Sequence, residues 1–151
     1  MQLLRKVASF SPSEDDLKNI YIIFIRSLLE QSATVWHSSL TQENIDDLER
    51  VQRSALKIIL KDKYKDYTNA LKILDIETLQ DRREQLCLNF AIKCVKHPKS
   101  KEMFPLNPNP TIGTRYHEKF KVQHAHNERL KDSPVIYMQK LLNEHERKNN
   151  K

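Results

Sequence analysis

The sequence predicts an all-α fold, a small bundle of about five helices with a proline-rich irregular segment before the last one. Only one of the 151 residues is a glycine, Gly113, and the tight hairpins of many-stranded folds depend on glycine at positive φ. Residue types that favour helix, among them Leu, Lys, Glu and Gln, are abundant instead. Apolar residues also recur at helical spacing, most clearly between residues 41 and 60.

The first helix of the predicted core spans residues 13–30. Ser11 is predicted to be its N-cap, with Pro12 at the first helical position and Glu14 completing a capping box. The centre of the helix, residues 20–25, is apolar on every side, which is also typical of a buried strand, but the cap and the continuing pattern favour helix. This stretch is either the centre of the core or a partner-binding surface, and we expect apolar surface to remain exposed on it.

The second predicted helix, residues 41–60, is amphipathic and begins at a Thr41 cap. Its acidic residues lie in its first turns and its basic residues in its last turns, which suits the helix dipole. The face expected to be buried carries apolar residues at offsets of three, seven and four, namely Ile45, Leu48, Ala55 and Ile59. The opposite face carries basic residues at offsets of three, four and four, namely Arg50, Arg53, Lys57 and Lys61.

Two further helices are predicted before the irregular segment. A short helix over 67–74 follows Asp66, which can cap it, and a longer helix runs over 78–96 until His97-Pro98 stops it. The inner face of the longer helix is predicted to carry Leu79, Leu86, Phe90 and Cys94, with Cys87, Ala91 and Val95 beside it. Several prolines and Gly113 then make residues 98–114 an irregular linker, and no element is predicted for residues 115–131.

The last predicted helix starts at Ser133-Pro134, a cap and first-position pair, and runs to about residue 145 with apolar contacts from Ile136, Leu141 and Leu142. The chain is thus expected to divide into three parts. These are a helical bundle over 1–97, a Pro-rich and basic connection over 98–132, and a C-terminal helix with a frayed tail over 133–151.

The net charge and the cysteines indicate which partners and which cellular compartment to expect. A net charge of +6 suits an anionic partner such as nucleic acid, but ordinary surface lysines explain it equally well. Cys87 and Cys94 lie on one predicted helix about 10 Å apart, too far for a disulfide, which is typical of a reduced intracellular protein. No apolar run is long enough to cross a membrane and no signal peptide is visible. We expect a nuclear or cytoplasmic protein that is not secreted.

No catalytic, metal or cofactor site is predicted. His117, His124 and His126 lack the spacing of a zinc site, and Cys87 and Cys94 lie on an apolar face without a neighbouring base. There is no Gly-x-Ser-x-Gly elbow. Trp36, in the connection before residue 41, is predicted to be a core anchor rather than a residue that stacks on a base.

Several segments in order carry a resemblance to one family. The chain resembles the region that follows the polymerase palm in non-LTR retrotransposon reverse transcriptases, and it is most similar to the jockey type. The residues that carry this resemblance are Ile25-Arg26-Ser27-Leu28-Leu29-Glu30, Val35-Trp36-His37, residues 48–60, Tyr67, Ala70-Leu71, Leu79, Arg82-Arg83-Glu84, Leu86-Cys87, Phe90-Ala91, Phe104-Pro105, Thr114-Arg115 and Ser133-Pro134 through Leu141-Leu142-Asn143. The match covers nearly the whole chain.

The resemblance implies a helical thumb with a C-terminal extension, a part that grips the primer–template duplex while the palm performs synthesis. Polymerases of this family need paired aspartates after an aromatic and a small residue to hold Mg²⁺, whereas Asp15-Asp16 and Asp46-Asp47 lie in the first turns of predicted helices. The resemblance therefore implies a non-catalytic fragment that begins just after the catalytic domain. Its expected partners are an RNA or DNA duplex backbone, bound weakly and salt-sensitively, and the missing palm domain or a second copy of the chain.

The candidate nucleic-acid contacts are basic residues on two helices: Arg50, Arg53, Lys57, Lys61, Arg82 and Arg83. Such residues can bind backbone phosphates without reading the sequence, but bases near a helix C-terminus also simply satisfy the helix dipole. The alternative function is a helical protein–protein interaction module, a repurposed or decaying remnant of a mobile element, which does not bind nucleic acid.

Overall fold

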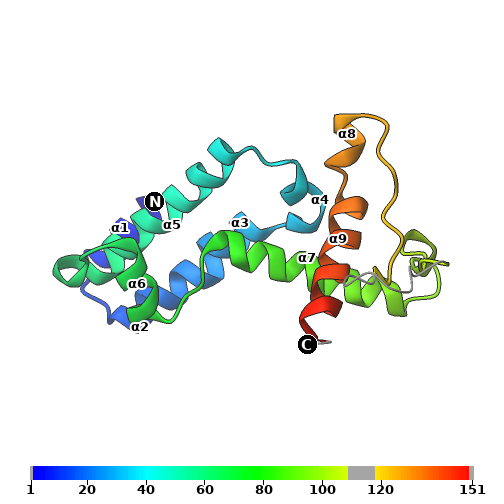
Figure 1. Ribbon diagram of the computed structural model, residues 1–151. Helices are drawn as coiled ribbons and strands as arrows, with labels where there is room; N and C mark the ends of the chain where they lie inside the picture. The colour runs from blue at the N-terminus through cyan, green and yellow to red at the C-terminus, as the bar shows by residue number, and fades with distance from the viewer. Residues whose placement is uncertain (1, 109–117, 150–151) are drawn as a thin grey trace. The chain divides into compact units, whose positions relative to one another are not determined.

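The computed structural model describes residues 2–108 and 118–149, and in these residues it confirms the predicted all-α fold (Figure 1). Two compact units can be distinguished, and each is described by itself. Unit 1 comprises Met1–Ala33 with Leu40–Arg83, and unit 2 comprises Thr34–Ser39 with Glu84–Lys151. The chain passes from one unit to the other after Ala33, after Ser39 and after Arg83. In the part of the chain that is described, no helix combines the length and the apolar character needed to cross a membrane.

Unit 1 is built from helices in both of its sequence segments (Figure 1). One helical stretch of unit 1 is continuous from residue 14 to residue 30, because the backbone stays helical through each junction. The elements of unit 1 are α1 (Gln2–Ala8), α2 (Glu14–Ile20), the π-helical segment η1 (Tyr21–Arg26), α3 (Ser27–Glu30), α5 (Gln42–Leu60), the 3₁₀ turn η3 (Lys61–Lys63), α6 (Tyr67–Leu74) and the first turns of α7 (Leu79–Lys96).

The helix that begins the core is capped two residues later than predicted. Ser13, not Ser11, is the N-cap: its Oγ accepts from the Asp16 amide at 3.1 Å, and the Asp16 carboxylate accepts from the Ser13 amide at 3.3 Å. Ser11 instead has a φ of 54°, in the left-handed region, and forms the turn after α1. The predicted helix itself is confirmed, and its apolar centre is the π-helical segment η1, not a strand.

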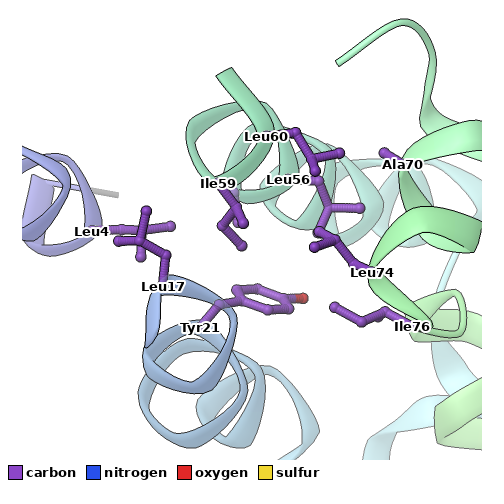
Figure 2. Packing of buried hydrophobic residues seen from close by; sticks show 10 residues of the cluster. Leu4, Leu17, Tyr21, Leu56, Ile59, Leu60, Ala70, Leu74 and Ile76 are labelled. Atoms are coloured by element: carbon purple, nitrogen blue, oxygen red, sulfur yellow. The ribbon is translucent and has the colours of Figure 1, made fainter. Parts of the chain in front are cut away.

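The core of unit 1 forms where α1, α2, α5 and α6 meet. Figure 2 shows Leu17 and Tyr21 facing Leu56 and Ile59 of α5, with Leu74 on the other side. The buried face of α5 lies in its C-terminal half and comprises Gln52, Ala55, Leu56, Ile59 and Leu60. The predicted inner residues Ala55 and Ile59 are buried, whereas Ile45 and Leu48 are half-buried, because α1, α2 and α6 pack against the later turns.

A polar network around Gln52 crosses this core. The Gln52 amide accepts from the Tyr21 hydroxyl and donates to the Tyr67 hydroxyl at 3.0 Å and to the Glu77 carbonyl at 2.9 Å. The Tyr67 hydroxyl in turn donates to the Glu49 carboxylate, whose other oxygen accepts from the Gln80 amide at 2.8 Å. Buried polar groups are costly unless paired, so this network fixes α5 against α6 and the start of α7.

Unit 2 contains the end of α4 (Ala33–Trp36), the 3₁₀ turn η2 (His37–Ser39), the rest of α7, the 3₁₀ turn η4 (Lys101–Met103), α8 (Glu128–Lys131) and α9 (Pro134–Asn149). Its core packs α7 against α9 with two phenylalanines from the connection between them. The buried residues are Cys87, Ala91, Cys94, Phe104, Phe120, Met138 and Leu142. Both cysteines are free thiols, as predicted.

Two predictions for the helices of unit 2 need correction. The buried row of α7 follows Cys87, Ala91 and Cys94, so Leu86 is half-buried and Phe90 is 44% exposed. Leu79 and Cys94 are buried as predicted. The reason for the difference is that two successive four-residue steps from Leu86 to Cys94 drift by about 80° around the helix, whereas the seven residues from Cys87 to Cys94 return to within about 20° of the same face. In addition, α9 continues to Asn149, beyond the predicted end near residue 145, although Ser133-Pro134 starts it as expected.

The predicted irregular linker, where it is described, begins with turns and η4 and becomes extended at Leu106. Leu106 and Phe120 form an antiparallel β-bridge, with the Asn107 amide donating to the Lys119 carbonyl at 2.9 Å. The rest of this linker, together with Gly113 and His117, falls within residues 109–117, outside the described residues. In the predicted connection Ala33 and His37 are buried, whereas Trp36, predicted to be a core anchor, is half-buried. The His37 ring meets that of Tyr137 edge-on, with the centroids 5.5 Å apart.

Candidate nucleic-acid interface

Helix α5 positions most of the predicted basic residues. Thr41 caps it as expected: its Oγ1 accepts from the Asn44 amide, and the Asn44 side-chain oxygen accepts from the Thr41 amide, each at 3.3 Å. Glu43 lies in the first turn and Lys57 in the last, which suits the helix dipole. Gln52 and Leu56 lie on the buried face, and Arg53 and Lys57, the residues that directly follow them, are exposed.

Two of these cations lie over aromatic rings. The Arg53 guanidinium carbon is 5.1 Å from the centroid of the Tyr67 ring, and the Lys57 ammonium is 5.4 Å from that of Tyr64. A guanidinium held over a ring keeps its N–H groups in its own plane, where they remain available to an oxyanion. Tyr67 is itself held by Gln52 and Glu49, so the platform under Arg53 is anchored to the core.

The platform tyrosine is a neutral hydroxyl over the ordinary pH range. Burial, together with the hydrogen bond to Glu49, raises the pKa of Tyr67 well above its usual value. Burial likewise raises the pKa of Tyr21. The Glu49 carboxylate accepts hydrogen bonds from the Tyr67 hydroxyl and from the Gln80 amide.

Arg50 and Lys61, at the two ends of the predicted row, differ from its centre. Arg50 is exposed and pairs with Asp47 at 2.7 Å, but an ion pair this exposed contributes little and exchanges readily for another anion. Lys61 is exposed, but it ends α5 with a φ of 49° and so leaves the helical row. The structure thus groups Arg50, Arg53 and Lys57 on one helix.

The two arginines predicted on the later helix are in different surroundings. Arg82 lies 3.3 Å from the Glu30 carboxylate, which also pairs with Arg26 at 3.4 Å. Arg83 is fully buried in this conformation, so its guanidinium does not reach solvent. The sequence did not show which of the two arginines is buried, because this depends on which face of α7 packs against the rest of unit 1.

The side chains considered for metal binding do not form a site in the described residues, where no group of three or more His, Cys, Asp or Glu side chains could hold a metal ion. The rings of His124 and His126 are 5.1 Å apart and tilted. His117 lies outside the described residues.

A second basic segment was missed by the sequence analysis. Residues 93–101 contain four lysines and no acidic residue, and the exposed ring of Phe90 lies one helical turn before them. This density of lysines is visible in the sequence, but the sequence analysis predicted only the end of a helix and the start of a linker here. The four lysines are Lys93, Lys96, Lys99 and Lys101.

Comparisons with known proteins add no relative from which a function could be transferred. No family model, no curated protein and no solved structure matches this chain.

Proposed function

We propose that the chain is a thumb-like, non-catalytic C-terminal part of a non-LTR reverse transcriptase, and that α5 binds the phosphate backbone of a nucleic-acid duplex without reading its sequence. One observation supports this above all. Arg53 and Lys57, one turn apart on α5, are both exposed and both lie over an aromatic ring that limits their freedom.

The local charge supports an anionic partner. Residues 50–65 contain six basic residues and one acidic residue, Asp62. Arg50 and Lys57 are separated by about 10 Å along the helix axis. A duplex carries one negative charge for about every 1.7 Å of its length, so a row of this length faces several phosphates.

The proposed contact is weak and electrostatic. Neutralising three phosphates gives a dependence of log K on log salt with a slope of about −2.7. Arg53 can bind one phosphate through two N–H groups, whereas Lys57 acts as a point charge. None of these groups touches a base edge in this proposal, so sequence preference is absent.

The resemblance and the geometry favour the same helix. Residues 48–60, which carry much of the similarity to the reverse transcriptases, contain Arg50, Arg53 and Lys57. The paired aspartates of a polymerase palm are not part of this resemblance, so the proposal assigns duplex binding and not nucleotide transfer. A protein with this function is expected in the nucleus or the cytoplasm.

The test is equilibrium binding of the full chain to a fluorescent primer–template duplex at about 50 mM and about 200 mM salt. We expect binding that weakens as salt rises, and a variant with Arg50→Glu, Arg53→Glu and Lys57→Glu that loses most of the affinity. Absence of binding at the lower salt concentration, or binding insensitive to salt, would overturn the proposal.

A matched control separates a local effect from net charge. Arg5, Lys6 and Lys72 are exposed on α1 and α6 of the same unit, and reversing all three changes the charge by the same amount. We expect this control to retain most of the duplex affinity. Equal loss in both triple variants contradicts a defined site on α5. Circular dichroism checks that both variants keep their helicity.

A second candidate function, a helical protein–protein module, is favoured by a different surface. Ile23, Phe24 and Leu28, on the continuous helix 14–30, are 60%, 56% and 70% exposed. They form an apolar stripe of the kind that marks interaction sites, suited to a palm domain or a second copy of the chain.

Sedimentation of nuclease-treated protein tests this second candidate. We expect self-association that is lost with Phe24→Glu and Leu28→Glu together and retained with Asn19→Glu and Thr68→Glu, which add the same charge at exposed positions of unit 1. A monomer at every concentration, together with duplex binding, leaves the first proposal alone standing.

A further inference from the structure

A groove in unit 2 combines exposed apolar side chains with basic ones. It has a volume of about 430 Å³ and lies between the second half of α7 and the turn that follows it. Phe90 and Met103, 44% and 42% exposed, contribute its apolar surface. Lys93, His97 and Lys99 contribute its basic side chains, and no acidic residue lines it.

The turn that forms one wall of the groove is fixed by hydrogen bonds. The Ser100 hydroxyl donates to the Cys94 carbonyl at 3.0 Å, and the Lys101 amide donates to the His97 carbonyl at 3.0 Å. The Met103 carbonyl accepts from the buried Gln139 amide of α9 at 2.8 Å. The groove is therefore largely formed before any ligand binds, which lowers the ordering cost of binding.

The lysines of this region outnumber the nearby acidic residues, of which Glu102 directly follows Lys101. Within the described part of the chain, no carboxylate forms an ion pair with Lys93, Lys96, Lys99 or Lys101. Lys93 and Lys96 complement the C-terminal dipole of α7, but Lys99 and Lys101 lie beyond the helix and have no such role. An occupant that supplies negative charge is therefore favoured.

We propose that this groove binds an unpaired nucleotide of a single strand, with the base against Phe90 and the backbone phosphates at Lys93 and Lys99. Aromatic surface beside lysines is the arrangement by which proteins hold single strands without reading their sequence. The groove volume lies within the range of sites for small ligands of nucleotide size. The inference rests on the proposed function, because both the groove and α5 would bind nucleic acid. The groove uses different residues and binds a single strand, whereas α5 binds a duplex.

The first experiment measures binding of the full chain to a single-stranded DNA oligonucleotide and to an abasic oligonucleotide of the same length. Stacking of one base contributes about five-fold to a hundred-fold in affinity. We expect Phe90→Leu, which keeps apolar volume but removes the ring, to lose that factor on the normal strand and nothing on the abasic strand. Phe90→Trp should retain or increase the affinity. Equal binding of the two strands by the unmodified protein would overturn the proposal.

Charge is tested with a matched pair of double variants. Lys93→Gln with Lys99→Gln should reduce the salt slope for the single strand by about 1.4, since each phosphate contact contributes about 0.7. Lys140→Gln with Lys148→Gln removes the same charge from exposed positions of α9 and should leave the slope unchanged. Equal effects of the two pairs, or equally tight binding of a polyglutamate peptide, contradict a nucleotide site.

Failure here and failure of the duplex proposal are distinguishable. Phe90→Leu should leave duplex affinity unchanged, and the triple reversal on α5 should leave the stacking effect of Phe90 unchanged. Loss of single-strand stacking alone removes the groove site, and loss of salt-sensitive duplex binding alone removes the α5 site.

Discussion

The side-chain amide of Asn143 makes both backbone hydrogen bonds of Phe120. The Phe120 amide donates to Asn143 Oδ1 at 2.9 Å, and Asn143 Nδ2 donates to the Phe120 carbonyl at 2.9 Å. One turn earlier on α9, the side chain of Gln139 also bonds to two backbone groups. It accepts from the Gln123 amide at 2.9 Å and donates to the Met103 carbonyl at 2.8 Å. Buried amides of a helix thus take the place of a neighbouring strand for the extended chain of unit 2.

Replacing Asn143 with leucine should destabilise the protein by about 2–4 kcal/mol, because the buried amide and carbonyl of Phe120 both lose their partner. The free energy of unfolding in urea, followed by the fluorescence of Trp36, measures the change. Asn149→Leu, at the exposed end of α9, should cost less than about 0.5 kcal/mol. Similar values for the two variants would mean that the Asn143 bonds do not hold this segment.

Unit 1 should lose stability steeply in alkali. The pKa values of Tyr21 and Tyr67 are raised in the folded protein from an ordinary value of 10.0, mainly by burial. The folded state therefore holds these protons more tightly than the unfolded state, so their contribution is intact below pH 10.0 and is lost as pH rises above it. Two such groups give a slope of up to about 2.7 kcal/mol per pH unit.

Urea unfolding at a series of alkaline pH values, followed by circular dichroism, measures this slope. Tyr21→Phe should lower the stability at neutral pH, because Gln52 loses a donor, and should make the alkaline decline shallower. An unchanged slope in Tyr21→Phe contradicts the assignment of Tyr21.

The capping residues of α2 offer a paired test. Ser13→Ala should cost about 1 kcal/mol, because the Asp16 amide loses its acceptor. Ser11→Gly should be neutral or stabilising by up to about 1 kcal/mol, because glycine adopts a φ of 54° without steric cost. Thermal unfolding by circular dichroism compares the two. The reverse ranking, with Ser11→Gly the more harmful, would restore Ser11 as the cap.

If the duplex proposal is correct, Arg53 and Lys57 are not interchangeable. Arg53→Lys keeps the charge but loses the planar fork above Tyr67, so duplex affinity should fall about five-fold, which corresponds to about 1 kcal/mol. Lys57→Arg is the reciprocal control and should bind at least as tightly as the unmodified protein. The measurement is duplex titration at low salt. Equal affinity of the two variants would show that charge alone matters at Arg53.

Local signals predicted most of the fold. Thr41, Asp66 and Ser133-Pro134 begin helices as expected, because a cap depends only on residues three or four positions away. The cap of α2 was predicted wrongly because two possible capping boxes overlap there. One pairs Ser11 with Glu14, and the other pairs Ser13 with Asp16. The turn after α1 places Ser11 in the left-handed region, so Ser13 and Asp16 form the capping box. The position of that turn depends on packing, which the sequence does not display.

The candidate site was predictable only in part. The exposure of Arg50, Arg53 and Lys57 follows from the period of α5, but the tyrosines beneath two of them come from after the helix ends. Arg83 is buried and Arg82 only half-buried because Arg83 lies one helical turn after the buried Leu79 and one turn before the buried Cys87. Which face of α7 is buried depends on tertiary packing. The groove at Phe90 was missed because Phe90 was predicted to lie on the inner face of α7, whereas its neighbour Ala91 is the buried residue.

The division of the chain into two units determines what spectroscopic and chemical probes can report. The single tryptophan and both cysteines belong to unit 2, and unit 1 contains neither residue type. Thiol labelling and indole emission will therefore follow the opening of unit 2, even while the helices around Gln52 remain intact. A denaturation curve recorded with these probes alone will report the stability of unit 2 and not that of the whole protein.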